Sequence, residues 1–181
     1  SANCQSFDSV IVNVNPPFNI SVGGDTFLCN GTSTNLITTI VDGGTPGYTY
    51  SWSPNLFISD TSISNPIVVP NDTITYTLTA TDANGAVSID SIKIYVSPLL
   101  SIQVSNDTLI CFGDTISISA NIIDSGFTPV TYSWHNSDSV FTPSALTTLV
   151  APYDTSMFIL TLEDSLSCTV SDTVVVNVNP I

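Results

Sequence analysis

Side chains that can do acid–base or nucleophilic chemistry are scarce in this sequence. Its 181 residues include one histidine, His135, one lysine, Lys93, and no arginine, against 15 acidic residues of which only Glu163 is a glutamate. Catalysis normally combines a nucleophile, a tunable base and a group that orients the base, and few such sets can be assembled from these residues. Two carboxylates alone would suffice to cleave a glycoside, but the aspartates recur in predicted turns, where a short carboxylate caps the local backbone. The sequence therefore predicts no enzyme.

The charge balance excludes two classes of partner. The formal net charge is −14, and nucleic acids and anionic lipid surfaces are both bound through Lys and Arg. No apolar run approaches the ~20 residues of a membrane helix, so we expect no direct insertion into a membrane. The chain starts at Ser1 without a charged segment before an apolar stretch, so we expect that any secretion signal has been removed or lies outside it.

An internal repeat governs the organisation of the chain, because identical residues recur 82 positions apart without a gap. The pairs are Cys29 and Cys111, Gly31 and Gly113, Tyr50 and Tyr132, Trp52 and Trp134, Pro70 and Pro152, Leu78 and Leu160, and Asp82 and Asp164. At twice that offset, residues 4–16 match residues 168–180. The sequence thus predicts the last strand of a preceding repeat at 1–16, a first full repeat at 17–98 and a second at 99–181.

Within each repeat the hydrophobic period is two, as in a half-buried strand. Ile74, Tyr76, Leu78 and Ala80 share one face, and the threonines between them share the other. Short strands of this kind, separated by turn clusters and with a Trp on the third strand, describe a Greek-key sandwich of immunoglobulin type with about seven strands. A single sheet could not bury its apolar face. The predicted fold is therefore all-β, with tandem immunoglobulin-like β-sandwiches.

Two aromatic pairs are predicted to anchor the cores. A Trp at this position of the third strand is the expected core residue, and alternation places a Tyr on the same face. The alternative is an aromatic platform that stacks on sugar rings. The predicted core anchors are Tyr50, Trp52, Tyr132 and Trp134, and the tyrosines better suited to exposed contacts are Tyr48, Tyr95 and Tyr153.

Aspartates in the turns are also candidate calcium ligands, because Ca²⁺ collects several hard oxygens from flexible loops. In an immunoglobulin-type sandwich the loop after the second strand and the loop after the sixth lie at the same end. This arrangement would bring Asp42 near Asp82, and Asp124 near Asp164. Backbone capping explains the same residues, and calcium is the one cofactor that the sequence suggests.

The order of motifs in each repeat resembles that of a known group. It runs from CxG through GGTPGYTYSW and TYTLTATDANG, as they stand in the first repeat, to SDTVVVNVNP, as it stands in the second. This is similar to the PKD-like and immunoglobulin-like repeats of giant Bacteroidota surface proteins, including gliding-motility adhesins and cargo of the type IX secretion system. The resemblance implies an extracellular or cell-surface location and a role as a stalk or adhesive spacer.

The four cysteines lack a CxxC pair and so favour disulfides in an oxidising compartment over a zinc or redox centre. Cys29 and Cys111 are predicted at the first hairpin of their repeats, and Cys4 and Cys168 after the last hairpin. Eight strand residues separate these ends by roughly 26 Å, beyond the ~7 Å Cα limit for a disulfide. If repeats stack end to end, Cys29 can reach Cys168 across the junction. Counting one cysteine of each type per repeat, as the resemblance suggests, favours Cys111 with Cys168 instead, and both pairings stay open.

The resemblance also implies sugar modification, because Bacteroidota modify Ser or Thr that follows Asp and precedes an apolar residue or Thr. The alternative is that Asp caps a turn and the next residues begin a strand. The glycosylation candidates are Ser9, Thr73, Ser91, Thr108, Thr115, Ser139, Ser165 and Thr173.

These observations together predict a non-catalytic stalk or spacer segment of an extracellular repeat adhesin or surface filament. Proline at the junctions, Pro16, Pro17 and Pro98, limits bending because it fixes φ. The alternative is a module accessory to a secreted enzyme that binds a glycan or a protein through its loops. Expected partners are neighbouring repeats of the same chain, or adjacent subunits that accept the strand Phe7 to Val14, and surface glycans for the alternative function.

Overall fold

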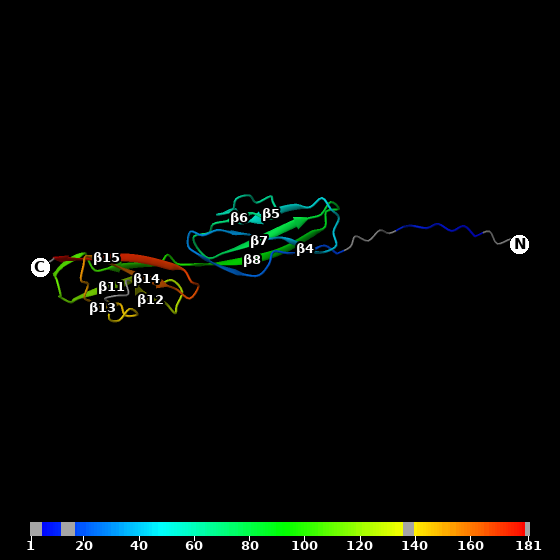
Figure 1. The fold of residues 1–181 in the computed structure, drawn as a ribbon. Coiled ribbons are helices and arrows are strands. Elements are labelled where there is room, and N and C mark those ends of the chain that lie inside the picture. Colours follow the sequence, from blue (N-terminus) through cyan, green and yellow to red (C-terminus); the bar gives the residue numbers. More distant parts are fainter. Residues whose placement is uncertain (1–4, 12–16, 136–139, 180–181) are drawn as a thin grey trace. The chain divides into compact units, whose positions relative to one another are not determined.

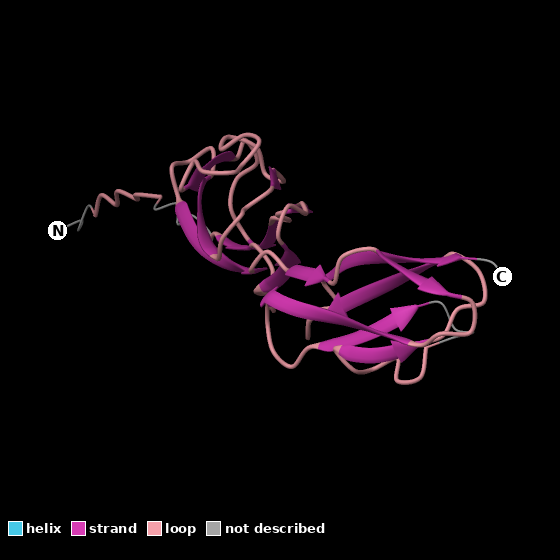
Figure 2. Ribbon diagram, turned by 90° about the vertical axis from the view of Figure 1, so that its left-hand side faces the viewer, coloured by secondary structure: helices cyan, strands magenta, loops and turns pink. Residues whose placement is uncertain are grey.

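The computed structural model describes residues 5–11, 17–135 and 140–179, and these consist of strands and loops (Figure 2). The described residues contain no helix that is long and apolar enough to cross a membrane. Val, Ile, Thr and Tyr, which favour strands, alternate along the chain and leave little helix-forming sequence. The prediction of an all-β fold is confirmed.

The first repeat forms one four-stranded sheet and two small two-stranded sheets, ordered β2-β8-β7-β5, β1-β4 and β3-β6. Figure 1 places β7 beside β8 in this part of the chain. The strands are β1 (Asn19–Ser21), β2 (Thr26–Cys29), β3 (Thr34–Asn35), β4 (Thr39–Asp42), β5 (Thr49–Ser53), β6 (Ile67–Val68), β7 (Ile74–Thr81) and β8 (Val87–Ser97).

The second repeat forms a four-stranded sheet, β10-β15-β14-β12, and a three-stranded sheet, β13-β11-β9. Its strands are β9 (Ser101–Val104), β10 (Thr108–Cys111), β11 (Ile116–Asp124), β12 (Thr131–His135), β13 (Thr147–Val150), β14 (Ser156–Glu163) and β15 (Thr169–Asn179).

Strand registers repeat between the two halves of the sequence. Trp52 pairs with Leu78 across β5 and β7, and Trp134 pairs with Leu160 across β12 and β14. In both repeats a short strand near the start runs parallel to the long last strand, β2 along β8 and β10 along β15. The 82-residue offset in sequence is therefore also an equivalence of structure.

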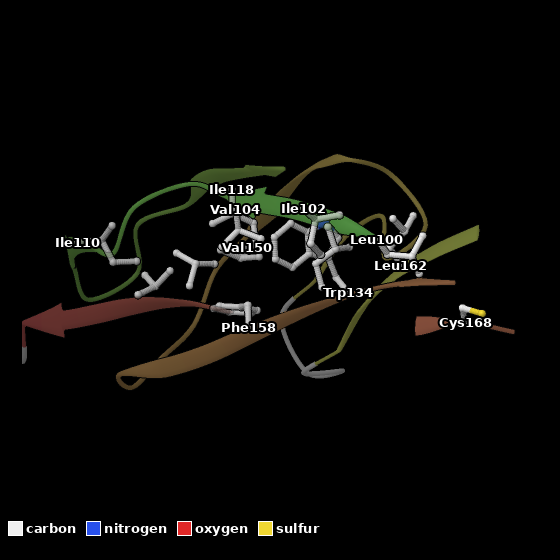
Figure 3. Close-up of a cluster of buried hydrophobic side chains, with 13 residues drawn as sticks. Leu100, Ile102, Val104, Ile110, Ile118, Trp134, Val150, Phe158, Leu162 and Cys168 are labelled. Atoms are coloured by element: carbon white, nitrogen blue, oxygen red, sulfur yellow. The ribbon is translucent and has the colours of Figure 1, made fainter. Parts of the chain in front are cut away.

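The core of the second repeat lies between its two sheets (Figure 3). Phe158, Leu160 and Leu162 point inward from β14, and Ile102 and Ile118 point inward from the other sheet. Figure 3 places Ile110 and Cys168 at opposite ends of this cluster. Two sheets that bury their facing sides define a sandwich.

Alternation also sets the core of the first repeat. Tyr76, Leu78 and Ala80 are fully buried on β7, as the period of two predicts, and Ile74 at the start of the strand is half-buried. The Tyr76 hydroxyl donates a hydrogen bond of 2.8 Å to the Leu56 carbonyl, so this polar group is satisfied inside the core.

Two compact units can be recognised in the backbone, and they do not coincide with the sequence repeats. One unit comprises residues 1–24, 35–67 and 75–92, and the other comprises 25–34, 68–74 and 93–181. The division passes through β7 and β8, because β2 pairs with the last residues of β8. The boundaries 17–98 and 99–181 stay predictions from the repeat.

The predicted strand from Phe7 to Val14 is not formed where the structure describes it. Residues 5–11 have no strand assignment, and residues 12–16 lie outside the described residues. The side chains of Phe7, Val10 and Ile11 are 87%, 86% and 85% exposed. A strand needs a partner for its backbone N–H and C=O groups, and this segment has none in the described chain.

Candidate functional site

A disulfide that spans the two repeats is the most distinctive chemical feature of the chain. Cys29 and Cys168 are joined with an S–S distance of 2.05 Å and a Cα–Cα distance of 5.5 Å. Both cysteines belong to the larger compact unit. Cys111 is free and exposed, so the pairing of Cys111 with Cys168 is wrong. The reason is geometric: Cys111 lies opposite Asn179 at the far end of β15 from Cys168.

Cys29 is presented by a tight turn at the end of β2. The Thr32 N–H donates to the Cys29 carbonyl over 3.1 Å, and Gly31 has a φ of 79°. This left-handed conformation favours glycine, because glycine has no Cβ that would clash with the backbone. The sequence motif CxG therefore encodes a cysteine at a fixed position on a turn.

Asp164 holds the hairpin that carries Cys168. Its Oδ1 accepts hydrogen bonds from the N–H groups of Leu166 and Cys168, at 2.8 and 2.9 Å. Its Oδ2 accepts from the Ser97 hydroxyl at 2.6 Å and from the Phe127 N–H at 3.3 Å. The carboxylate thus connects three segments of the larger unit around the disulfide.

The environment of Asp164 has two opposing effects on its pKa. Burial raises the pKa, because it penalises the charged form, but the hydrogen bonds from Ser97, Cys168, Leu166 and Phe127 lower it. The net effect is a pKa below that of an ordinary aspartate. Asp164 is therefore a structural anion at neutral pH.

Gly126 is required beside this carboxylate. A Cβ at this position would lie 2.6 Å from Leu100 Cδ2, 2.8 Å from Asp164 Oδ2 and 3.0 Å from Ser97 Oγ. The φ of Gly126 is also positive, at 66°. The Ser97–Asp164 contact can form because residue 126 is a glycine and places no side chain between these two groups.

A small open pocket lies next to the disulfide. Its volume is about 130 Å³, and Cys29, Pro98, Leu100 and Cys168 are among its lining residues. Ligand pockets usually measure ~300 Å³ or more. This pocket suits a few water molecules rather than a sugar or a cofactor.

The first repeat contains the equivalent carboxylate, Asp82. Its Oδ2 accepts from the Thr45 N–H at 2.8 Å, and its Oδ1 accepts from the N–H groups of Asn84 and Ala86 at 2.9 and 2.8 Å. The hydrogen bond from Thr45, followed by those from Ala86 and Asn84, lowers the pKa of Asp82 even though burial opposes the shift. Ala86 stands where Cys168 stands in the second repeat, so this hairpin offers no sulfur.

The calcium candidates divide into two kinds. Asp82 and Asp164 are buried, and their carboxylate oxygens accept hydrogen bonds from backbone N–H groups. Asp42 and Asp124 are exposed at the ends of β4 and β11. The turn after Asp42 reaches Asp82 through Thr45. Among the residues that the structure describes, no group of three or more His, Cys, Asp or Glu is placed to hold a metal ion. Calcium binding stays a prediction that titration calorimetry can test.

Further aspartates that sequence reasoning did not single out serve the backbone in both repeats. Asp90 and Asp172 accept from the N–H groups of Val22 and Val104, at 2.9 and 3.0 Å. Asp25 and Asp107 accept from the N–H groups of residues 93 and 175, at 2.9 and 2.8 Å. Their recurrence at the 82-residue offset was the signal that could have revealed them.

The four aromatic residues predicted as core anchors differ in burial. Trp52 and Trp134 are each 3% exposed, and their indole N–H groups donate 3.0 Å hydrogen bonds to the carbonyls of Ile63 and Ala145. Tyr50 and Tyr132 are half-buried. Neither tryptophan presents a face on which a sugar could stack. Of the other tyrosines, Tyr153 is 72% exposed, and Tyr48 and Tyr95 are half-buried and stacked on Phe18 and Phe27.

Most glycosylation candidates are accessible in the described chain, and several follow an Asp that binds the backbone. In four of them, Ser9, Thr73, Ser91 and Thr173, the N–H donates to the preceding Asp carboxylate at 2.7 to 2.8 Å. The exposed members are Ser9, Thr73, Ser91, Thr115, Ser165 and Thr173, Thr108 is half-buried, and Ser139 lies outside the described residues. Modification of any of them stays a prediction.

Comparisons with known proteins agree with this architecture. A family model of the SprB repeat matches residues 27–57. No curated protein matches the chain. A solved structure of the N-terminal eight Ig domains of Down Syndrome Cell Adhesion Molecule is similar with a TM-score of 0.62, at 12% identity over 93% of this chain and 25% of that one. The chain has the fold of tandem immunoglobulin-like β-sandwiches.

Two further solved structures show the same fold. Extracellular domains 3–5 of Drosophila OTK give a TM-score of 0.51, at 14% identity over 91% of this chain and 60% of that one. An I-band fragment of titin gives a TM-score of 0.50, at 12% identity over 93% and 67% of the two chains. This chain thus spans between a quarter and two thirds of these three structures. At such low identity the similarity shows that the chain has an immunoglobulin-like fold, and nothing beyond the fold.

Proposed function

We propose that the chain is a non-catalytic stalk or spacer segment of an extracellular repeat adhesin or surface filament. The observation that carries the proposal is the Cys29–Cys168 bond, which connects one repeat covalently to the next. The buried 2.6 Å hydrogen bond between Ser97 and Asp164 supports the same connection. A disulfide of this kind persists in an oxidising compartment, which agrees with an extracellular location.

The surface chemistry supports a spacer. Exposed serines and threonines on the strands, such as Ser51, Thr75 and Ser119, together with a net charge of −14, keep such a segment hydrated and oppose lateral association. The carboxylates of Asp82, Asp164, Asp90 and Asp172 are engaged by backbone N–H groups. They are therefore committed to holding turns rather than to chemistry on a substrate.

Neighbouring repeats are the partners that the N-terminal segment favours. The exposed apolar side chains of Phe7, Val10 and Ile11 belong to a sequence that matches β15 at a distance of two repeats. An edge of a preceding sandwich would cover them and supply the missing backbone hydrogen bonds.

Small-angle X-ray scattering tests the spacer function. We expect the oxidised chain to give a narrower distribution of sizes than a Cys29→Ser and Cys168→Ser double variant, because the variant loses its covalent connection. A glycan array probed with the oxidised chain should show no saturable binding. Equal scattering from both chains, or saturable binding to one glycan class, contradicts the spacer function.

A loop-mediated binding module is the second candidate, and one observation favours it. Phe112 and Tyr153 form an exposed aromatic pair with ring centroids 5.9 Å apart, and they are 46% and 72% exposed. Exposed aromatic rings at loops can stack on sugars. If the array shows binding, Tyr153→Ala should abolish it and Tyr95→Ala should not.

A further inference from the structure

Cys111 occupies in the second repeat the position that Cys29 occupies in the first. The two cysteines lie 82 residues apart, and each ends the short strand that runs parallel to the last strand of its repeat. Cys29 is disulfide-bonded and Cys111 is a free, exposed thiol. The same cysteine position is therefore disulfide-bonded in the first repeat and a free thiol in the second.

The turns that present the two sulfur atoms have the same backbone geometry. In the first, the Thr32 N–H donates to the Cys29 carbonyl over 3.1 Å, and in the second the Asp114 N–H donates to the Cys111 carbonyl over 3.1 Å. Gly31 and Gly113, two residues after each cysteine, have φ values of 79° and 87°. Both cysteines are thus held in the same way relative to their own repeat.

The register shows where each sulfur lies with respect to the exit of the chain. Cys29 pairs with Ser97, after which the chain continues through Pro98 into the repeat that supplies Cys168. Cys111 pairs with Asn179, the residue equivalent to Ser97. Cys111 therefore lies beside the point where a following repeat would begin.

No cysteine within its own repeat can serve Cys111. Cys168 immediately precedes β15, whereas Cys111 lies opposite Asn179 at the other end of that strand. Eleven residues of extended strand span roughly 35 Å, and Figure 3 places Ile110, next to Cys111, at the opposite end of the core from Cys168. Cys168 is, in addition, already bonded to Cys29.

We propose that Cys111 is the attachment site for a second cross-repeat disulfide. Its partner is a hairpin cysteine, at the position equivalent to Cys168, in a further repeat of the same kind that follows Asn179. The bonds along the polypeptide are then staggered, each linking the first turn of one repeat to the last hairpin of the next. Whether a junction is bridged depends on the hairpin residue of the later repeat, since a hairpin with Ala86 accepts no bond.

The bond forms by two thiol–disulfide exchanges with a disulfide-bearing oxidant, such as a dithiol oxidase or oxidised glutathione. The Cys111 thiolate attacks the oxidant's disulfide, which forms a mixed disulfide and releases one thiolate. The thiolate of the hairpin cysteine then attacks Cys111 Sγ and releases the second. In total, two cysteine thiols are oxidised, the oxidant is reduced to two thiols, and the two protons end on the released thiolates.

The test adds a third repeat to the intact chain. Residues 100–181 are fused after Ile181, which preserves the 82-residue spacing, with Cys4→Ser and with serine at the added copy of Cys111. The protein is refolded with oxidised glutathione, alkylated and digested without reduction. We expect two cross-linked peptides, one joining Cys29 to Cys168 and one joining Cys111 to the added copy of Cys168.

The matched control fuses residues 18–99 instead, with serine at the added copy of Cys29. Its hairpin carries a copy of Ala86, so Cys111 should be recovered almost wholly alkylated. The proposal is overturned if Cys111 is alkylated equally in both fusions while the Cys29–Cys168 bond is present, or if Cys111 forms only bonds between separate molecules. The inference rests on the proposed function in one respect, namely that repeats follow one another along the polypeptide. Scattering from the unfused chain tests the spacer function separately.

Thiol reactivity of the unfused chain provides a second measurement that does not need the added repeat to fold. With Cys4→Ser, the folded and oxidised protein should react with one equivalent of 5,5′-dithiobis(2-nitrobenzoate), and Cys111→Ser should lose that reaction. A folded chain whose Cys111 does not react with this small disulfide overturns the proposal.

Discussion

At the scale of residues, aspartate serves in this chain as an acceptor for backbone N–H groups. Asp82 and Asp164 each collect donors from two turns and are nearly inaccessible, at 6% and 4% exposure. Their recurrence in turns was predictable from the repeat. The Ser97 hydroxyl on Asp164 was not, because the equivalent residues 15 and 179 are asparagines and no motif marks the exception.

The lowered pKa values of these two carboxylates predict loss of stability in acid. A carboxylate with a lower pKa in the folded state stabilises that state above the unfolded pKa of ~3.9, and the contribution is lost as the pH falls through the folded value. We expect the urea concentration at the midpoint of unfolding to decrease when the pH is lowered below about 4. Asp82→Asn and Asp164→Asn should lower the midpoint at pH 7 and flatten its dependence on acid.

The exposed Asp124→Asn serves as a control for the loss of one negative charge. Urea unfolding followed by tryptophan fluorescence at several pH values measures all four chains. A pH dependence in Asp164→Asn as steep as in the parent chain would show that this carboxylate has no such role.

Gly126 yields a second prediction at this scale. Gly126→Ala introduces both a positive φ for alanine and close contacts with Leu100, Asp164 and Ser97. Gly113→Ala shares the positive φ but meets no atom within 4 Å. We expect Gly113→Ala to cost about 1–2 kcal/mol and Gly126→Ala more than that. Equal losses in denaturant unfolding would mean that the packing around Asp164 is loose.

At the scale of elements, the alternation of side chains predicted the strands and their buried faces. It did not predict that the first repeat interrupts a strand that is continuous in the second. Residues 116–124 form the single strand β11, whereas residues 34–42 form β3 and β4 with a break at 36–38. Thr38 explains the break: its N–H donates to Asn65 Oδ1 and its hydroxyl to the Ser64 carbonyl. Hydrogen bonds that involve side chains and replace strand pairing do not follow the alternation of residues from which strands are predicted.

The burial of Trp134 predicts a large cost for its removal. Trp134→Ala should destabilise the chain by about 3–5 kcal/mol, because it leaves a cavity and an unpaired Ala145 carbonyl. His135→Ala, at the next position and exposed, should have little effect. Denaturant unfolding followed by circular dichroism checks both, and a small loss for Trp134→Ala would contradict its role in the core.

At the scale of the whole molecule, the repeat predicted tandem sandwiches but left the cysteine pairing undecided. Spacing along the strands excluded a pair within one repeat, yet counting one cysteine of each type per repeat favoured it. The structure joins Cys29 to Cys168, since the turn and the hairpin meet in the larger unit. Contacts between distant segments decided the question, and these are not encoded in local periodicity.

Removal of this bond should cost more stability than removal of any single hydrogen bond. Cys168→Ser opens a loop with a sequence separation of 139 residues, and closing loops of this size stabilises proteins by about 2–5 kcal/mol. Cys29→Ser should behave alike and should not lead to a new Cys111–Cys168 bond. Alkylation with mass spectrometry checks this outcome, and a Cys111–Cys168 peptide would contradict the register of β10 and β15.

The same bond also determines how the polypeptide transmits a pull. A load that arrives at Cys29 can cross the sulfur atoms to Cys168 and leave along β15, so the backbone enclosed between them carries no tension. Without the bond, a separation of 139 residues could be drawn out by roughly 480 Å. With it, a pull can draw out only the residues that precede Cys29 and those that follow Cys168, and the backbone enclosed between them cannot be extended.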